Sequence, residues 1–131
     1  MARLLVEIAE YLAAQTGWTL EADLFAYGFP PQGADTAVAL LDGPGRPEAV
    51  RPLAELGDFD VQMISRSRQP AEAAQRADIV MSKLHGLSVT DLGTWIVQYA
   101  VATQTPYPMG YDSRGRYEYV NHYRMRATAG S

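Results

Sequence analysis

The sequence predicts an α+β domain: a mostly antiparallel sheet of four to five strands with two helices packed on one face. Two segments repeat apolar residues with the period of an amphipathic helix, and several shorter segments are compactly apolar or alternate apolar and polar residues. The predicted order is helix, two or three strands, helix and two strands, and the last two strands form a long C-terminal hairpin. Strands and helices grouped in this way are typical of α+β domains.

The first helix is predicted near the N-terminus, where apolar residues share one helical face. These residues are Leu4, Leu5, Ile8, Tyr11 and Leu12. Glu7 and Glu10 lie off this face, and Gly17 is a natural C-terminal stop.

Short strands are predicted at 23–27, 36–41 and 61–65. The first ends at a pair of prolines, and the second leads into the turn sequence Asp42-Gly43-Pro44-Gly45. The third alternates between its two sides, as a half-buried strand does.

The second helix is predicted to begin at Pro70, because proline suits the first helical turn. Its apolar face consists of Ala73, Ala77, Val80, Met81 and Leu84. Gly86 ends it, and Lys83 is favourably placed in its last turn.

The last third of the chain holds the long hairpin, with strands at 94–103 and 117–126 and six of the eight tyrosines. One face of the first strand is expected to carry Trp95, Val97, Tyr99 and Val101. Thirteen residues lie between Thr103 and Tyr117, and loops of that length are typically functional or disordered. Two prolines and the turn sequence Asp112-Ser113-Arg114-Gly115 favour an ordered loop. It either contacts another protein or folds back on its own sheet.

Length and composition predict one domain, residues 1–127, with a flexible C-terminal tail at 128–131. With 131 residues, 47% of them hydrophobic, the chain can bury one core. It has no cysteine and two histidines, so no disulfide, structural metal or cofactor is expected. No apolar run approaches the roughly 20 residues that cross a bilayer, and a soluble intracellular protein without a membrane partner is expected.

Charge is divided unevenly along the chain. Residues 1–60 hold ten acids and three arginines, a net of −7, and the remainder holds eight bases and five acids, a net of +3. An acidic face of one copy could therefore meet a basic face of another head to tail, although ordinary solvated surface explains the division equally well. The overall charge of −4 argues against tight duplex DNA binding.

No residue pattern indicates catalysis, and the protein is predicted not to be an enzyme. Arg66 and Arg68, just before the second helix, could bind an anion, but a solvated capping segment fits them better. Asp112, Ser113 and His122 supply an acid, a nucleophile and a base, yet no spacing singles them out.

Four segments, taken in order, resemble the tail terminator proteins of long-tailed bacteriophages, often labelled minor capsid or head–tail joining proteins. The segments are the helix at 4–12, the strand Val61-Gln62-Met63-Ile64-Ser65-Arg66, the stretch from Ala77-Asp78 to Leu84-His85-Gly86-Leu87, and the ending from Pro106 through Gly115-Arg116-Tyr117 to Asn121. The resemblance covers the chain from the first helix to Arg126 and implies a virion structural protein.

The resemblance also implies a homohexameric ring that caps the tail tube, stops tube polymerisation and docks the head–tail connector or stopper protein. Its partners would be further copies of itself, the tail tube protein and the connector, and genome DNA would pass through the lumen without specific binding. The protein would lie in the tail or neck of the virion, assembled in the bacterial host cytoplasm. The alternatives are another neck protein, such as a head-closure adaptor or contractile-tail terminator, and a small-ligand-binding or enzymatic α+β domain.

The candidates for contact with a neighbouring subunit or the tube are Tyr107, Tyr111, Asp112, Arg114, Arg116, Arg66 and Arg68. Most lie in or beside the long loop, where aromatic side chains near arginines are typical protein-contact anchors. The double change Arg114→Glu with Arg116→Glu is expected to impair ring or tube binding and to leave the monomer fold intact.

Overall fold

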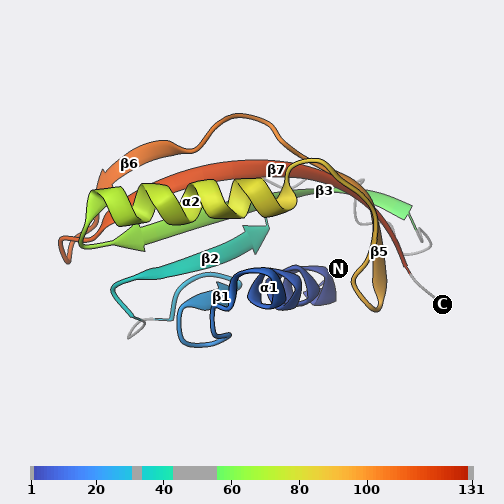
Figure 1. Cartoon of the computed structure of the whole chain (residues 1–131), viewed down its shortest axis with the longest axis horizontal. Coiled ribbons are helices and arrows are strands. Elements are labelled where there is room, and N and C mark those ends of the chain that lie inside the picture. The colour runs from blue at the N-terminus through green and yellow to red at the C-terminus, as the bar shows by residue number, and fades with distance from the viewer. Residues whose placement is uncertain (1, 31–33, 43–55, 130–131) are drawn as a thin grey trace.

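The computed structural model describes residues 2–30, 34–42 and 56–129, and these residues fold into two helices and one seven-stranded sheet (Figure 1). The elements are α1 (Ala2–Thr16), β1 (Leu24–Ala26), β2 (Ala37–Asp42), β3 (Leu56–Ser67), α2 (Pro70–Leu84), β4 (Leu87–Asp91), β5 (Trp95–Ala102), β6 (Tyr107–Tyr111) and β7 (Tyr117–Ala129). The α+β class and both predicted helices are confirmed.

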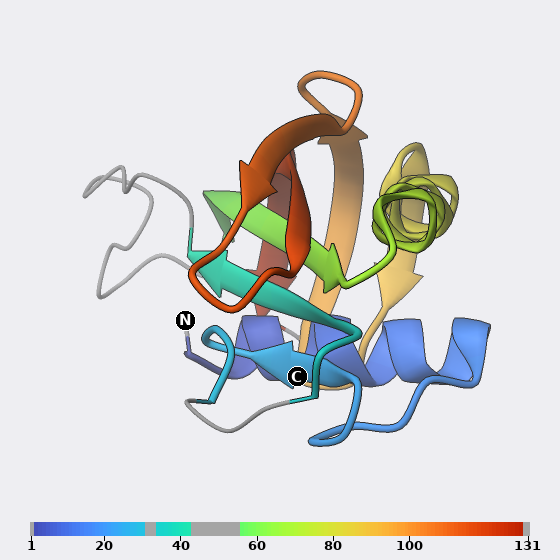
Figure 2. The same ribbon diagram turned by 90° about the vertical axis from the view of Figure 1, so that its left-hand side faces the viewer.

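The sheet is mostly antiparallel and curls around the core (Figure 2). Its order is β1-β2-β3-β7-β5-β4, and β1 runs parallel to β2. The long strand β7 pairs with β3 on one side, and on its other side with β6 near its start and β5 near its end. β5 and β6 therefore lie one after the other along the same edge of β7.

One main core lies between the helices and one face of the sheet. Alternate strand residues enter it: Val38 and Leu40 from β2, Phe59, Val61 and Met63 from β3, and Tyr123, Met125 and Ala127 from β7. Both helices contribute buried residues to the same core: Leu4, Leu5, Ile8 and Leu12 from α1, and Ala77, Val80 and Leu84 from α2. Both helices thus cover the same face of the sheet.

The sheet has more strands than the four to five that the sequence predicts, because β4 and β6 give no clear strand pattern. β4 is an edge strand with half-buried or exposed side chains, so it has no buried face to produce alternation. β6 contains Pro108 and Gly110, which are depleted in strands but tolerated at a sheet edge. The predicted long loop is therefore largely a strand that folds back on its own sheet.

A β-bulge in β5 changes the face that two side chains occupy. The register with β7 shifts by one residue between Val97 and Tyr99, which makes Gln98 the extra residue. Val97 is buried as predicted, and after the bulge Ala100 is buried as well. Tyr99 and Val101 are each 37% exposed. The prediction that they share the face of Val97 was wrong, because one extra residue exchanges the two faces of a strand.

The C-terminal strand is longer than predicted. β7 continues through Ala129, and Thr128 pairs with Leu56 and Ile96, although a flexible tail was expected at 128–131. Residues 130–131 and the predicted turn at 43–45 lie outside the described residues.

Glu7 is buried, although the helical pattern places it off the apolar face. It is 5% exposed, and its carboxylate accepts hydrogen bonds from the backbone N–H groups of Thr94 (3.1 Å) and Trp95 (3.0 Å). Glu7 therefore connects α1 to the turn between β4 and β5.

Candidate functional site

The predicted contact loop is a hairpin formed by β6, a tight turn and the start of β7 (Figure 1). We call residues 107–117 the arm. A bulge between Pro108 and Gly110 leaves Met109 as the extra residue of β6. Met109 is 58% exposed and Tyr111 is 65% exposed. Large apolar side chains that are exposed together on one element indicate a contact surface.

Hydrogen bonds order the turn at the tip of the arm. Oδ1 of Asp112 accepts from the backbone N–H groups of Arg114 (2.8 Å) and Arg116 (2.9 Å), and Oδ2 accepts from Arg116 Nε (2.8 Å). Gly115 has a φ of +77°, a conformation that side chains disfavour. Because the tip is ordered in advance, contacts made through it lose little conformational entropy.

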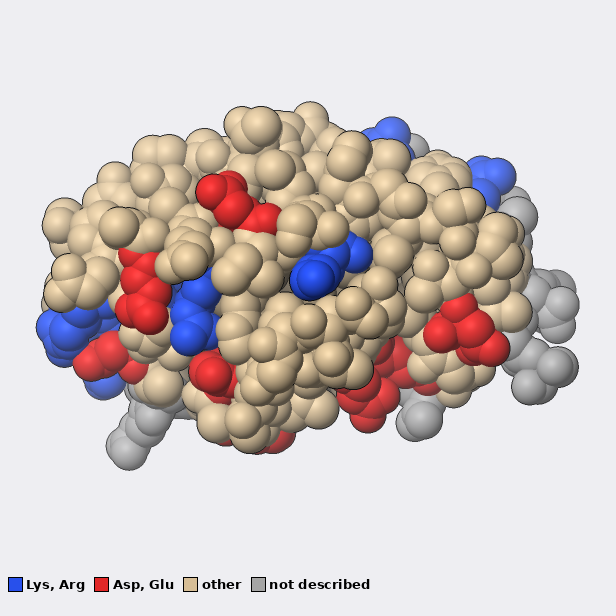
Figure 3. All heavy atoms as spheres, viewed as in Figure 1, with Lys and Arg blue, Asp and Glu red and all other residues tan. Residues whose placement is uncertain are grey.

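Arg116 also joins a charge cluster at this end of the sheet, where acidic and basic side chains lie intermingled (left end of Figure 3). Asp35 lies between two arginines: its Oδ2 is 2.8 Å from Arg68 Nε, and its Oδ1 is 3.7 Å from Arg116 Nη1. The hydrogen bond from Arg68 is the main cause of a lowered pKa at Asp35. Through Arg116 and Asp35, the cluster links the arm to the segment that leads into β2.

Arg66 is a structural member of the same region. It is 4% exposed, and its Nε and Nη2 donate to the Ala34 carbonyl at 3.2 and 2.8 Å. Its guanidinium lies 3.7 Å from the centroid of the Phe29 ring. Burial, and then the positive charge of Arg116, lower the pKa of Arg66.

The structure thus brings the predicted site residues into one region and divides them into two groups. The exposed group consists of Tyr107, Tyr111, Arg114 and Arg68, of which Arg68 is also paired with Asp35. The group held by contacts within the chain consists of Asp112, Arg116 and Arg66. Since Arg116 is 7% exposed and paired, the double change Arg114→Glu with Arg116→Glu is not suitable for testing contacts alone.

Asp112 should make stability depend on pH in the acid range. Burial alone would raise its pKa, but hydrogen bonds from the Arg116 and Arg114 backbones and from the Arg116 side chain outweigh burial and lower it. A carboxyl with a lowered folded pKa stabilises the fold above its unfolded pKa, and this contribution is lost as pH falls through the folded pKa. We expect the stability lost in Asp112→Asn to be constant above about pH 5 and to shrink below about pH 4.

The pKa of Glu118 is shifted in the opposite direction to that of Asp112, so the experiment must control for Glu118. Burial, and then the charge of Asp112, raise the pKa of Glu118. A raised carboxyl pKa favours the fold at low pH, and that contribution is lost as pH rises. Urea unfolding of Asp112→Asn should therefore be compared in a Glu118→Gln background. A stability difference that does not change from about pH 3 to pH 7 would contradict the role of the Asp112 carboxylate.

The uneven charge along the sequence is partly neutralised within one copy. Across β3 and β7, Arg126 pairs with Asp58 at 2.8 Å, and Arg124 pairs with Asp60 at 3.5 Å. Acids from the first half thus meet bases from the second half inside the chain. The division of charge by itself therefore gives little support to a head-to-tail contact.

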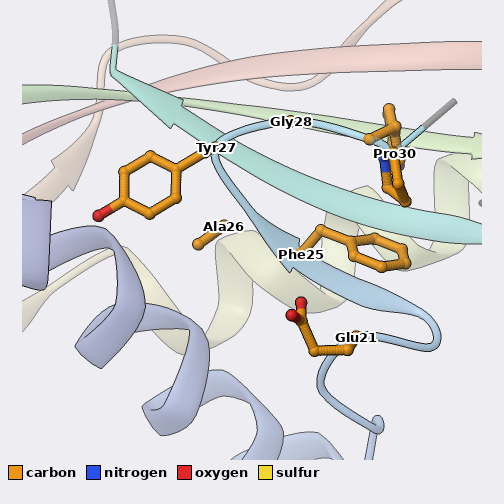
Figure 4. Close-up of a pocket in the computed structure, with 7 residues that line it drawn as sticks. Glu21, Phe25, Ala26, Tyr27, Gly28 and Pro30 are labelled. Atoms are coloured by element: carbon orange, nitrogen blue, oxygen red, sulfur yellow. The ribbon is translucent and has the colours of Figure 1, made fainter.

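A second exposed apolar surface, which the sequence analysis does not identify, lies between α1 and β1. A cavity of about 300 Å³ there is lined by Val6, Ala9, Leu20, Glu21, Ala26 and Tyr27. A neighbouring cavity of about 400 Å³ shares three of these residues, and Figure 4 shows Tyr27 and Phe25 extending to opposite sides of β1. The one sequence signal for this surface is Val6, an apolar residue outside the predicted helical core face.

In the described part of the chain, the three candidate catalytic residues are not assembled and no metal-binding group is formed. No hydrogen bond joins Asp112, Ser113 and His122, and the Asp112 carboxylate is bonded to Arg116 and to the turn backbone. Within 2–30, 34–42 and 56–129, no three His, Asp or Glu side chains are grouped to bind a metal ion. In the same ranges no helix is long and apolar enough to span a membrane.

Comparison with known proteins gives a match to a protein family and matches to solved structures. A family model described as bacteriophage tail terminator protein matches residues 11–129, which includes every strand of the sheet. The chain also superimposes with a TM-score of 0.63 on a chain of the "Virion of native gene transfer agent (GTA) particle", with 18% identity and 98% of each chain covered. At this identity the likeness shows a shared fold. No curated protein sequence matches.

The family match spans most of the chain, from the second half of α1 to the end of β7, and includes the arm. It agrees with the resemblance found in the sequence. The chain belongs to the bacteriophage tail terminator protein family.

Proposed function

We propose that this chain forms a ring, expected to be a hexamer, that caps the tail tube and stops tube polymerisation. The opposite face of the ring docks the head connector, and DNA passes through the lumen without specific binding. The family match over residues 11–129 carries this proposal, because membership makes the chain a structural protein of a phage tail or neck. A contractile-tail terminator or head-closure adaptor would share the ring geometry and differ in its partners.

Such a protein acts by shape and charge rather than by bond chemistry. One of its faces must be complementary to the tube subunit. The other face must lack the surface to which a further tube subunit would bind. The arm supports this role, because it is ordered by the Asp112 hydrogen bonds and exposes Met109 and Tyr111. A rigid element with exposed large side chains is suited to protein recognition.

The two groups of site residues have separate tasks in this proposal. Exposed Tyr107, Tyr111, Arg114 and Arg68 contact the neighbouring subunit or the tube. Asp112, Arg116 and Arg66 hold the arm in the shape that makes those contacts.

Arg114→Glu should impair capping and leave the monomer folded. The Arg114 side chain is exposed at the tip of the arm, so reversing its charge changes recognition more than stability. We expect capping of tail tubes to weaken about tenfold or more. The measurement is tube length in electron micrographs of tails assembled with each variant.

The matched control is Lys83→Glu, which makes the same charge change at the end of α2. It should give tubes of wild-type length. Tubes that stop at the normal length with Arg114→Glu would contradict a contact role for this side chain. Tubes that stop normally without any copy of the chain would overturn the proposed function itself.

A further inference from the structure

We propose that the groove between α1 and β1 binds the arm of a second copy of this chain. The groove consists of Val6, Ala9, Leu20, Glu21, Ala26 and Tyr27. The inference rests on the proposed ring and deepens it, because it assigns the two surfaces that meet at each subunit boundary.

The groove is an exposed apolar hollow. Val6 and Leu20 are each 38% exposed, and Tyr27 is 51% exposed. Single apolar side chains on a surface are ordinary, but these three line one cavity of about 300 Å³. A cavity of this size can accept a large side chain from a partner.

The backbone on both sides of β1 is strained. Glu21 has a φ of 66° and Tyr27 has a φ of 70°, and both residues line both cavities. Residues other than glycine, asparagine and aspartate rarely adopt such a conformation. Strain of this kind is concentrated at binding sites, where the surrounding structure holds it in place. The strain is an observation independent of the exposure and points to the same groove.

The arm matches the groove in apolar character. Met109 and Tyr111 are the most exposed large apolar residues of β6. Methionine adapts to irregular apolar surfaces, and tyrosine adds a large rigid ring with a polar end. The Tyr111 ring packs edge-on against Tyr117 at 4.8 Å between centroids, so the arm is stiffened before it binds.

The groove and the arm also carry opposite charges. Glu21 lies in the groove and Arg114 at the tip of the arm. Within the described part of the chain, neither side chain takes part in an ion pair. Both charges are therefore available to pair across a boundary between copies.

The arm and the groove of one chain lie apart in the sheet, so the arm does not bind the groove of its own chain. β2, β3 and β7 separate β1 from β6, and Figure 2 shows β1 near the bottom of the molecule and β6 near its top. Each copy thus presents one arm and one groove at different places. A contact between unlike surfaces of identical chains repeats, and it closes into a ring when the rotation permits.

Cysteine cross-linking tests this contact, because the natural chain has no cysteine. A chain carrying Leu20→Cys and Met109→Cys should form a ladder of covalent oligomers on oxidation, both free and on tail tubes. The matched control carries Met109→Cys and Asp78→Cys, with the second cysteine at an exposed position on α2. We expect at least about tenfold less cross-linking in the control.

Mixing variants tests the head-to-tail order. A groove variant, Val6→Glu with Leu20→Glu, and an arm variant, Met109→Glu, should each fail to associate in light scattering or on tubes. All three positions are exposed, so circular dichroism should show a wild-type fold. Mixed together, the variants should form pairs that do not grow, because one intact arm and one intact groove remain. Reversing both charges, Glu21→Arg with Arg114→Glu, should restore association that either single change weakens.

The outcomes separate the two proposals. If the chains assemble and cap tubes while both cysteine pairs cross-link equally, the groove assignment is overturned and the proposed function stands. The same conclusion follows if mixed variants never pair while the wild-type chain assembles. If the wild-type chain neither associates nor caps tubes, both proposals are overturned.

Discussion

Replacing Arg116 by alanine is expected to lower the free energy of unfolding by about 2–4 kcal/mol. The side chain is 9% exposed and donates to Asp112 Oδ2 at 2.8 Å, and it lies 3.7 Å from Asp35. Its removal leaves the half-buried Asp112 carboxylate without its cation. Urea unfolding should show a lower midpoint, and the arm should lose its ordered tip. Capping of tail tubes should therefore also weaken in this variant.

The control for Arg116 lies two residues away in the same turn. Arg114→Ala removes the same chemical group from an exposed position, so stability should change by less than about 0.5 kcal/mol. Equal destabilisation by the two changes would contradict the structural role of Arg116. Loss of capping in Arg114→Ala at unchanged stability would instead show that the tip makes direct contacts.

The contrast between these two arginines shows what the sequence could not reveal. Both lie in one charged turn sequence, and both were predicted as contact residues. Their difference arises because Asp112 organises the turn so that Arg116 points back toward Asp35. Asp35 is far away in sequence and reaches the arm only once β2, β3 and β7 have paired. No local sequence pattern indicates that Asp35 and Arg116 lie close together.

The helices and the long strands could be predicted because each carries a regular apolar period and a clear stop. Gly17 and Gly86 follow the two helices, and both have positive φ as helix ends favour. β4 and β6 could not be predicted, since a strand exposed at a sheet edge has no buried face and so no alternation of apolar and polar residues. The bulge at Gln98 could not be predicted either, because it is determined by the pairing with β7 and not by the local composition.

Of the two candidate surfaces, the sequence indicates the arm and not the groove, for a related reason. The arm was visible as a cluster of tyrosine, proline, glycine and charge within one stretch of sequence. The groove combines Val6 from α1 with Leu20 and Tyr27 from the segments around β1, so it exists only after these elements pack. A surface assembled from separate segments leaves single apolar residues in the sequence, and such residues are common on any protein.

Replacing Glu7 by alanine is expected to destabilise the fold by about 2–4 kcal/mol. Its carboxylate accepts from two consecutive backbone N–H groups, those of Thr94 and Trp95, and the second bond is buried. These donors belong to the turn that follows Gly93, whose φ of +122° requires glycine. Without the carboxylate, the Trp95 N–H loses its acceptor in a place that water reaches poorly, and the part-buried hydrogen bond from Thr94 is lost as well. Urea unfolding, with hydrogen exchange at Trp95, would measure the loss.

Glu10→Ala is the matched control, because Glu10 is an exposed acid one turn further along α1. It should change stability by less than about 0.5 kcal/mol. The loss of stability in Glu7→Gln should fall between the losses in Glu7→Ala and Glu10→Ala. The amide keeps one acceptor oxygen, but its NH₂ group replaces the other oxygen and faces a backbone N–H donor. A Glu7→Gln variant as stable as the wild type would show that one hydrogen bond is enough to hold the turn. If all three variants were equally stable, α1 would be held by its apolar face alone, and the junction between α1 and the β4–β5 turn would not depend on this carboxylate.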